Sequence, residues 1–158
     1  MRFVPRKVLP HDTPAWVADG SLFFITVHCA ERGRAQLTLP TTGNALLQAV
    51  AHYHKTQRWF VRLFLLMPDH WHALLAFPPT ESMRKTIADW KRYTSRRDGI
   101  RWQRDFFDHR IREGESWLLK AAYIRENPVR KGLIARPEDW PWILGHDASG
   151  VFDGGAGS

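Results

Sequence analysis

The sequence has little cysteine and no long apolar run. Cys29 is the only cysteine, which excludes an internal disulfide and a zinc site of the CxxC type. The most apolar stretch, residues 60–77, is broken by an arginine, a proline, an aspartate and two histidines, so no segment is apolar and long enough to span a bilayer. The first residues also lack the continuous apolar stretch of a signal peptide. We therefore expect a soluble, cytoplasmic protein with no membrane partner.

Acidic residues are in the minority. The 158 residues include 23 Lys and Arg against 16 Asp and Glu, which gives a formal net charge of +7 and a pI near 10.1. This charge favours polyanionic partners, although basic charge alone does not establish a nucleic acid as the partner. The length and the 44% hydrophobic content predict one compact domain. We place it at residues 1–145 and expect the glycine-rich residues 146–158 to form a flexible tail.

Hydrophobic patterning predicts a chain in which strands and helices alternate. The expected strands cover residues 22–28, 59–67, 70–77 and 102–111, the middle two being joined as a hairpin by Pro68 and Asp69. The expected helices begin at Thr41 or Thr42, at Thr80 or Ser82, and near Glu113. The first should end near Gln57 and the last at Asn127, because Pro128 disfavours the helical conformation of the residue before it. This order predicts an α+β fold, a mainly antiparallel sheet with helices packed on it.

Two histidines are the first candidates for chemistry. They occur in MPDHWHALLA, residues 67–76. Side chains alternate along a strand, so His70 and His72 should share one face while Trp71 anchors the other. Two neighbouring imidazoles can bind one metal ion. The alternative is a pair of polar residues on a partly open face.

The last predicted helix adds a polar stripe. Its members recur every three or four residues and are Ser116, Lys120, Tyr123 and Asn127. An adjacent apolar stripe would hold this stripe at the margin of the sheet, and it comprises Trp117, Ala121 and Ile124. Asn127 offers a carbonyl oxygen as a third ligand, and Tyr123 offers a phenol as a nucleophile. The alternatives are a hydrogen-bonded rim tyrosine and a helix-terminating asparagine.

These residues resemble those of a known family, the REP-associated tyrosine transposases, a branch of the single-tyrosine HUH transposases. The resemblance covers most of the chain and is carried by the segments LFFITVHCAERGR, MPDHWHALLAF, WKRYTSR, YIRENPVRKGLI and PEDWPW. It implies a ferredoxin-like fold and a metal-dependent endonuclease and strand transferase that acts on single-stranded DNA. The implied substrates are hairpins of repetitive extragenic palindromes with a short guide tetranucleotide beside them.

The resemblance also implies a role for each candidate residue. His70 and His72 are the HUH pair, Asn127 is the third ligand, and Tyr123 is the nucleophile that forms a 5′-phosphotyrosine and leaves a 3′-hydroxyl. The implied ion is Mg²⁺ or Mn²⁺, although imidazole on general grounds favours transition metals. Lys120 is our candidate for assisting removal of the phenol proton. Tyr93 is the alternative nucleophile.

Further basic residues are candidates for contacts with the DNA backbone, with a solvated basic surface as the alternative. They are Lys91, Arg92, Arg96 and Arg97 in the second predicted helix, and Arg2, Arg6 and Lys7 near the start. Three other functions stay open: a module that recognises the palindromes without cutting them, a metal-dependent hydrolase with a water nucleophile, and a relaxase-like replication initiator. We expect a monomer, with a dimer as the alternative.

Overall fold

The computed structural model describes residues 17, 22–112 and 115–145. Its strands are β1 (Leu22–His28), β2 (Phe60–Leu66), β3 (His70–Ala76), β4 (Phe107–Arg110) and β5 (Ile143–Gly145). Its helices are α1 (Pro40–Lys55), α2 (Met83–Asp98) and α3 (Trp117–Arg130), followed by the short 3-10 turn η1 (Pro137–Asp139). No helix within these described residues is long and apolar enough to cross a membrane.

The strands form one antiparallel sheet in the order β4-β1-β3-β2-β5. The first four strands in the chain, with α1 and α2, follow the β-α-β-β-α-β pattern of a ferredoxin-like fold. Each helical crossover joins two strands that are separated in the sheet by one other strand. The predicted α+β, ferredoxin-like architecture is confirmed, and β5 extends it beyond β2.

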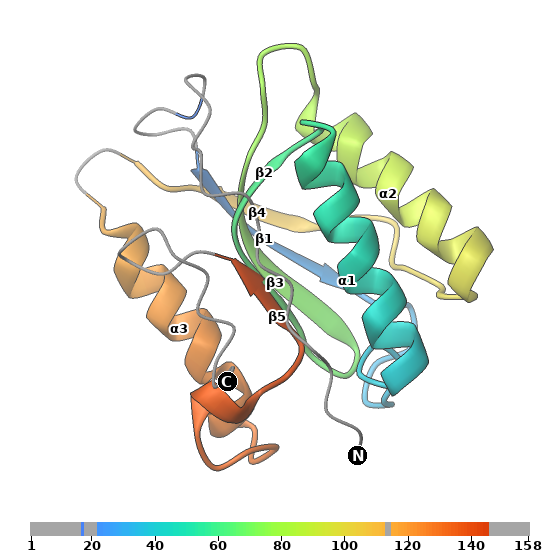
Figure 1. Ribbon diagram of the computed structural model, residues 1–158, viewed down its shortest axis with the longest axis vertical. Helices are drawn as coiled ribbons and strands as arrows, with labels where there is room; N and C mark the ends of the chain where they lie inside the picture. The colour runs from blue at the N-terminus through green and yellow to red at the C-terminus, as the bar shows by residue number, and fades with distance from the viewer. Residues whose placement is uncertain (1–16, 18–21, 113–114, 146–158) are drawn as a thin grey trace.

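The helices lie on both faces of the sheet (Figure 1). α1 and α2 cover one face, and α3 lies against the other. The aromatic core fills the α1 and α2 side, where Phe64 and Trp71 are 4.4 Å apart and Trp71 and Trp90 are 5.7 Å apart between ring centroids. Trp59 completes this cluster, at 6.0 Å from Trp90. Because these rings are fully buried, they fix the sheet against α2 and leave the other face for α3.

The expected bounds of three elements were wrong. α1 begins at Pro40 with Leu39 as its N-cap, rather than at Thr41 or Thr42, because proline is well suited to the first helical turn. The predicted strand 102–111 is reduced to β4. The chain before β4 instead follows a loop in which Trp102 makes an isolated bridge and donates its indole N–H to Thr94.

The third error concerns α3, which does not end at Asn127. It continues through Pro128 to Arg130, since a proline near the C-terminal end removes only one backbone hydrogen bond. The backbone N–H of Leu133 donates to the Pro128 carbonyl, and the left-handed Gly132 (φ +74°) ends the helix. At the other end, α3 begins at Trp117 and not near Glu113, because Ser116 is the N-cap and accepts a hydrogen bond from the Leu119 N–H.

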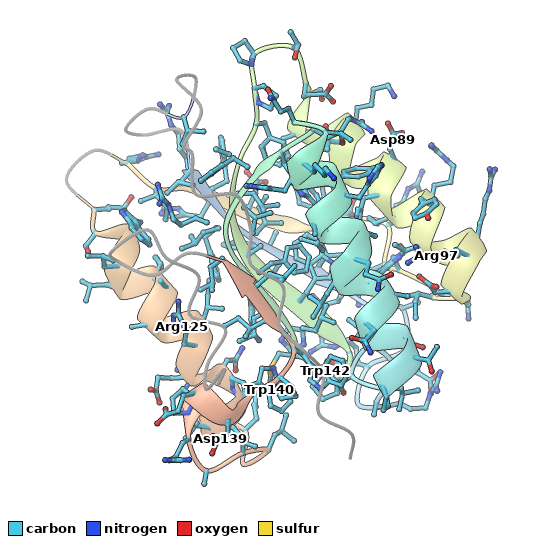
Figure 2. The ribbon with its side chains drawn as sticks, in the orientation of Figure 1. Asp89, Arg97, Arg125, Asp139, Trp140 and Trp142 are labelled. Carbon is cyan, nitrogen blue, oxygen red and sulfur yellow. The ribbon has the colours of Figure 1, made fainter. Side chains whose placement is uncertain are left out.

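No pattern in the sequence predicted β5. This strand is three residues long, too short for a periodic pattern to indicate it. Trp140 fixes it by donating its indole N–H to the Leu66 carbonyl at 2.9 Å, and Trp142 lies beside it (Figure 2). Gly43 of α1 is in such close contact with the Trp142 ring that a side chain there would clash. The expected tail, residues 146–158, lies outside the described residues.

The buried Cys29 provides a test of this packing. Its side chain is fully buried, and burial raises the pKa of the thiol to about 12. We expect the native protein to resist a thiol reagent such as DTNB at pH 8. The urea-unfolded protein should react within seconds and release one equivalent of thionitrobenzoate per chain. Full labelling of the native protein within seconds would show that this end of β1 is open.

Candidate active site

Two histidines lie side by side on β3, on the face of the sheet that α3 covers. The ring centroids of His70 and His72 are 4.7 Å apart, and the rings are nearly perpendicular, at 79°. They share this face because they are two residues apart on one strand, whereas Trp71 between them packs against α2. The structure thus brings the two imidazoles together, as the alternation predicted.

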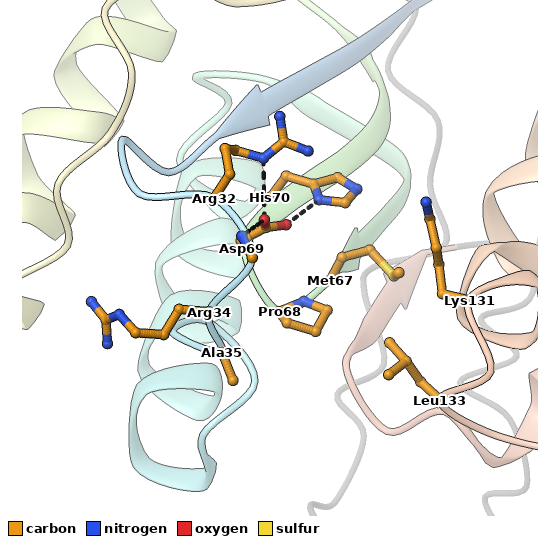
Figure 3. Close-up of a pocket in the computed structure, with 10 residues that line it drawn as sticks. Arg32, Arg34, Ala35, Met67, Pro68, Asp69, His70, Lys131 and Leu133 are labelled. Atoms are coloured by element: carbon orange, nitrogen blue, oxygen red, sulfur yellow. Dashed lines mark hydrogen bonds and ion pairs between the residues drawn. The ribbon is translucent and has the colours of Figure 1, made fainter.

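Asp69 and Thr26 engage the Nδ1 atoms of this pair. His70 Nδ1 lies 2.7 Å from Asp69 Oδ1 (Figure 3), and His72 Nδ1 lies 2.8 Å from Thr26 Oγ1. When Nδ1 carries the ring proton and donates it, the Nε2 lone pair is left for an external ligand. Such a partner also fixes the orientation of a metal-binding imidazole. In the sequence, Asp69 was predicted only as a turn residue. Thr26 was not predicted at all, and the strand register places it opposite His72.

Electrostatics hold both histidines neutral. Burial lowers the pKa of His70 and, together with neighbouring positive charges, lowers that of His72 to about 3. For Asp69, burial disfavours the charge, but hydrogen bonds from Gly33, His70 and Arg32 outweigh burial and lower the pKa to about 2. Because a metal ion binds neutral imidazole, the pair needs to lose no proton at neutral pH.

A third imidazole lies next to the pair. His28 on β1 is the register partner of His70, and their ring centroids are 5.0 Å apart. Burial, followed by the charge of Arg32, lowers the pKa of His28 as well. The sequence showed only that His28 ends a predicted strand. Its position beside His70 depends on the pairing of β1 with β3, which no local pattern reveals.

α3 carries the other candidates on the same face. Asn127 is only 5% exposed, whereas Tyr123 is 52% exposed and so is open to a substrate. Lys120 Nζ lies 5.4 Å from the ring centroid of Phe24, and this ring in turn stacks on His72 at 5.6 Å and 16°. Lys120 is therefore linked to the histidine pair through one aromatic ring.

Arg130, which the sequence did not indicate as a site residue, contacts Tyr123 in two ways. Its guanidinium carbon lies 4.1 Å from the centroid of the tyrosine ring, and the group donates a hydrogen bond of 2.9 Å to the Tyr123 carbonyl. Burial and two neighbouring histidines are the larger causes of the low pKa of His72, and the charge of Arg130 also contributes to it. One cation therefore acts on both the tyrosine and the histidine pair.

The predicted donor set is of a chemical type that divalent cations accept. Among the residues that the structure describes, no three His, Cys, Asp or Glu side chains are grouped so that they could hold an ion. An ion at His70 and His72 therefore needs a donor of another type, and the amide oxygen of Asn127 is the predicted one. Two imidazole nitrogens and one amide oxygen leave coordination positions open for a substrate, as a catalytic ion requires.

The predicted basic residues of α2 are not brought to this site. They lie on α2, on the opposite side of the sheet from α3. Figure 2 shows this separation with Arg97 on α2 and Arg125 on α3. Most of them have intramolecular partners: Lys91 with the Arg104 carbonyl, Arg92 with Asp89, and Arg97 with Asp98 and the Tyr93 hydroxyl. Tyr93, the alternative nucleophile, therefore also lies away from the histidine pair. Arg2, Arg6 and Lys7 lie outside the described residues.

Replacing Asp69 should weaken both the fold and the metal site. We expect Asp69→Asn to lower the free energy of unfolding by about 1–3 kcal/mol at pH 7 and Mn²⁺ affinity by roughly 10–100-fold. Because folding lowers the pKa of Asp69 from 3.8 to about 2, the stability difference is complete above pH 4 and shrinks as the pH falls toward 2. Urea denaturation and titration calorimetry measure the two effects.

The matched control is Asp139→Asn, which removes a carboxylate from an exposed ion pair with Arg136. Its stability should change by less than about 0.5 kcal/mol, and its Mn²⁺ affinity should not change. Equal behaviour of the two variants would show that Asp69 does not orient His70.

Comparisons with known proteins identify the family of the chain. The model of the family described as Transposase IS200 like matches residues 23–125. A REP-associated tyrosine transposase of Escherichia coli (strain K12) is 26% identical over 130 residues, covering 80% of this chain and 78% of that protein. A relative from Haemophilus influenzae is 26% identical over 146 residues, covering 80% and 81%.

Solved structures share the fold. A REP-associated tyrosine transposase bound to a REP hairpin superposes with a TM-score of 0.68 at 23% identity, over 84% of this chain and 81% of that one. A chain from Deinococcus radiodurans superposes with a TM-score of 0.51 at 14% identity, over 77% and 96%. The family match spans the strands and helices that carry the histidine pair, Lys120 and Tyr123, and with it the resemblance seen in the sequence is confirmed. The chain belongs to the IS200-like transposase family, and it is an enzyme of the transposase and nuclease class.

Proposed function

We propose that this chain is a metal-dependent endonuclease and strand transferase that cuts single-stranded DNA through Tyr123. The observation that carries the proposal is the histidine pair on β3. Both Nδ1 atoms are engaged by protein partners, and the helix packed on the same face exposes a tyrosine. This combination of ligands and nucleophile is what a covalent phosphoryl transfer needs.

A divalent cation held by His70, His72 and Asn127 would supply positive charge opposite the scissile phosphate. We propose Mg²⁺ or Mn²⁺. The amide oxygen and the phosphate oxygens are the hard donors that both ions prefer, and the two imidazoles favour Mn²⁺ over Mg²⁺. With the ring protons on Nδ1, Asp69 and Thr26 would accept them and leave the Nε2 atoms free to bind such an ion.

Tyr123 is the proposed nucleophile. Its phenolic oxygen forms a bond to phosphorus while the bond from phosphorus to the 3′ oxygen breaks. The products are a 5′-phosphotyrosine on the enzyme and a 3′-hydroxyl, which takes up a proton. Arg130 holds the tyrosine ring from one side, so the exposed phenol is restrained before the strand arrives. We propose that Lys120 assists removal of the phenol proton.

The proposed substrate is single-stranded DNA beside a palindromic hairpin. The Escherichia coli relative is REP-associated by name, and the solved structure with the same fold is bound to a REP hairpin. The net charge of +7 supports a nucleic-acid substrate. A further support is Phe107, 54% exposed on β4, because the register aligns it through Thr26 with His72. An exposed aromatic ring there can stack on an unpaired base.

Basic residues away from the site have a separate proposed role. Lys91, Arg92, Arg96 and Arg97 lie across the sheet, so we propose that they contact backbone phosphates of the hairpin rather than the scissile phosphate. The same contact type is proposed for Arg2, Arg6 and Lys7. We also propose a monomer, because the candidate ligands and the nucleophile lie on β3 and α3 of one chain, and these two elements contact each other.

Removing the phenol should abolish covalent chemistry. Incubation of the wild-type protein and Mn²⁺ with a single-stranded oligonucleotide that carries palindromic repeats should yield a protein and DNA adduct on a denaturing gel. We expect Tyr123→Phe to lose the adduct by at least about 100-fold and chelation to abolish it. Tyr93→Phe is the matched control and should retain the adduct.

Each other outcome contradicts part of the proposal. An adduct that survives Tyr123→Phe and disappears in Tyr93→Phe would assign the nucleophile to α2. Cleavage without any adduct would indicate a water nucleophile, and binding without cleavage would indicate a recognition module.

A further inference from the structure

A pocket of about 270 Å³ opens beside His70. Its walls come from three segments that are distant in the sequence: residues 32–35 after β1, residues 67–70 between β2 and β3, and Lys131 and Leu133 after α3 (Figure 3). Because His70 itself forms part of the wall, whatever occupies the pocket lies next to the histidine pair.

The walls are fixed to the site by hydrogen bonds. The Gly33 N–H donates to Asp69 Oδ2 at 2.7 Å, and Asp69 Oδ1 holds the imidazole of the adjacent histidine. The backbone N–H groups of Gln36 and Leu37 both donate to the Pro68 carbonyl, at 2.8 and 2.9 Å. The pocket is therefore preformed and keeps a constant position relative to the candidate metal ligands.

The cations of the pocket differ in their availability. Arg32 is paired with Asp69 at 3.1 Å, and Arg34 is paired with Glu31 at 3.0 Å. Lys131 has no ion pair within the part of the chain that the structure describes, and Figure 3 shows it extended toward the His70 side of the pocket. Lys131 is thus the cation that is available to an incoming anion.

The floor of the pocket is apolar. Pro68 contributes apolar surface from the turn, above the fully buried Met67, and Leu133 contributes it from the segment after α3, where it is 44% exposed. The pocket thus offers an apolar floor for a flat ring and one free positive charge beside it.

We propose that this pocket binds one unpaired nucleotide of the substrate strand, adjacent to the scissile phosphate. The base lies on Pro68 and Leu133, and Lys131 contacts the phosphate. The volume is near the lower end of the range for small-molecule sites, which suits a single splayed nucleotide and excludes a paired and stacked duplex end. Binding by stacking, without hydrogen bonds to the base edges, needs a base at this position but accepts any of the four bases. This inference rests on the proposed function for the identity of the strand.

An abasic scan tests the proposal. Single abasic sites are placed at every position of the unpaired segment beside the hairpin, and Kd is measured by fluorescence anisotropy in EDTA so that the strand stays intact. We expect one position near the cleavage site to raise Kd by about 5- to 150-fold for the wild-type protein. Changing the identity of the base at that position should alter Kd by less than about 5-fold. A scan with no sensitive position overturns the proposal.

Two variants then locate that position in the pocket. Ala35→Trp fills the pocket from an exposed residue and should raise Kd for intact DNA while removing the effect of the abasic site. Leu39→Trp, outside the pocket, should keep the wild-type profile. Lys131→Met should reduce the salt dependence of binding by about one counterion, whereas Lys55→Met on α1 should not. An unchanged profile in Ala35→Trp and an unchanged salt slope in Lys131→Met would overturn the proposal.

Failure of the pocket and failure of the proposed function give different results. A Tyr123-dependent adduct together with no abasic-sensitive position would overturn the proposed nucleotide pocket and support the proposed nuclease function. A position that is sensitive in the wild type and insensitive in Ala35→Trp, without any adduct, retains the nucleotide pocket in a protein that binds but does not cut.

Discussion

The carboxylate of Asp69 connects the parts of the site. It accepts hydrogen bonds from His70 Nδ1, the Gly33 N–H and Arg32 Nε. These bonds orient one imidazole, hold the loop after β1 against the turn between β2 and β3, and place a wall of the pocket beside the histidine. Because three donors outweigh the effect of burial, the carboxylate keeps its charge with a pKa of about 2. A neutral residue at this position could not accept all three bonds with the same strength.

The two faces of the sheet have separate tasks. On one face, the aromatic rings of β2, β3 and α2 form a closed core. On the other face, burial keeps His70 and His72 neutral and therefore able to bind a cation, while α3 adds Asn127 and an exposed Tyr123. The alternation of β3 joins these tasks, since Trp71 anchors in the core the same strand that presents the histidines. Structural stability and chemistry thus depend on one strand.

The sequence predicted what depends on local pattern. The HxH alternation, the hairpin and the stripe on α3 are periodic features, and they placed the two histidines on one face. Contacts that depend on strand register or on distant segments could not be predicted from local pattern. Thr26 and His28 meet the histidines only through the pairing of β1 with β3. Arg130 was missed because Pro128 was expected to end α3, although the helix continues far enough to bring Arg130 onto Tyr123.

We propose that His70, His72 and Asn127 hold one divalent ion on the face of the sheet that α3 covers. The most direct test is a crystal of the protein soaked in Mn²⁺, with anomalous data collected at the manganese edge. We expect one strong peak within about 2.0–2.5 Å of both Nε2 atoms and of the Asn127 amide oxygen. A peak bound through Nδ1, a peak at another cluster, or no peak at this pair would contradict it.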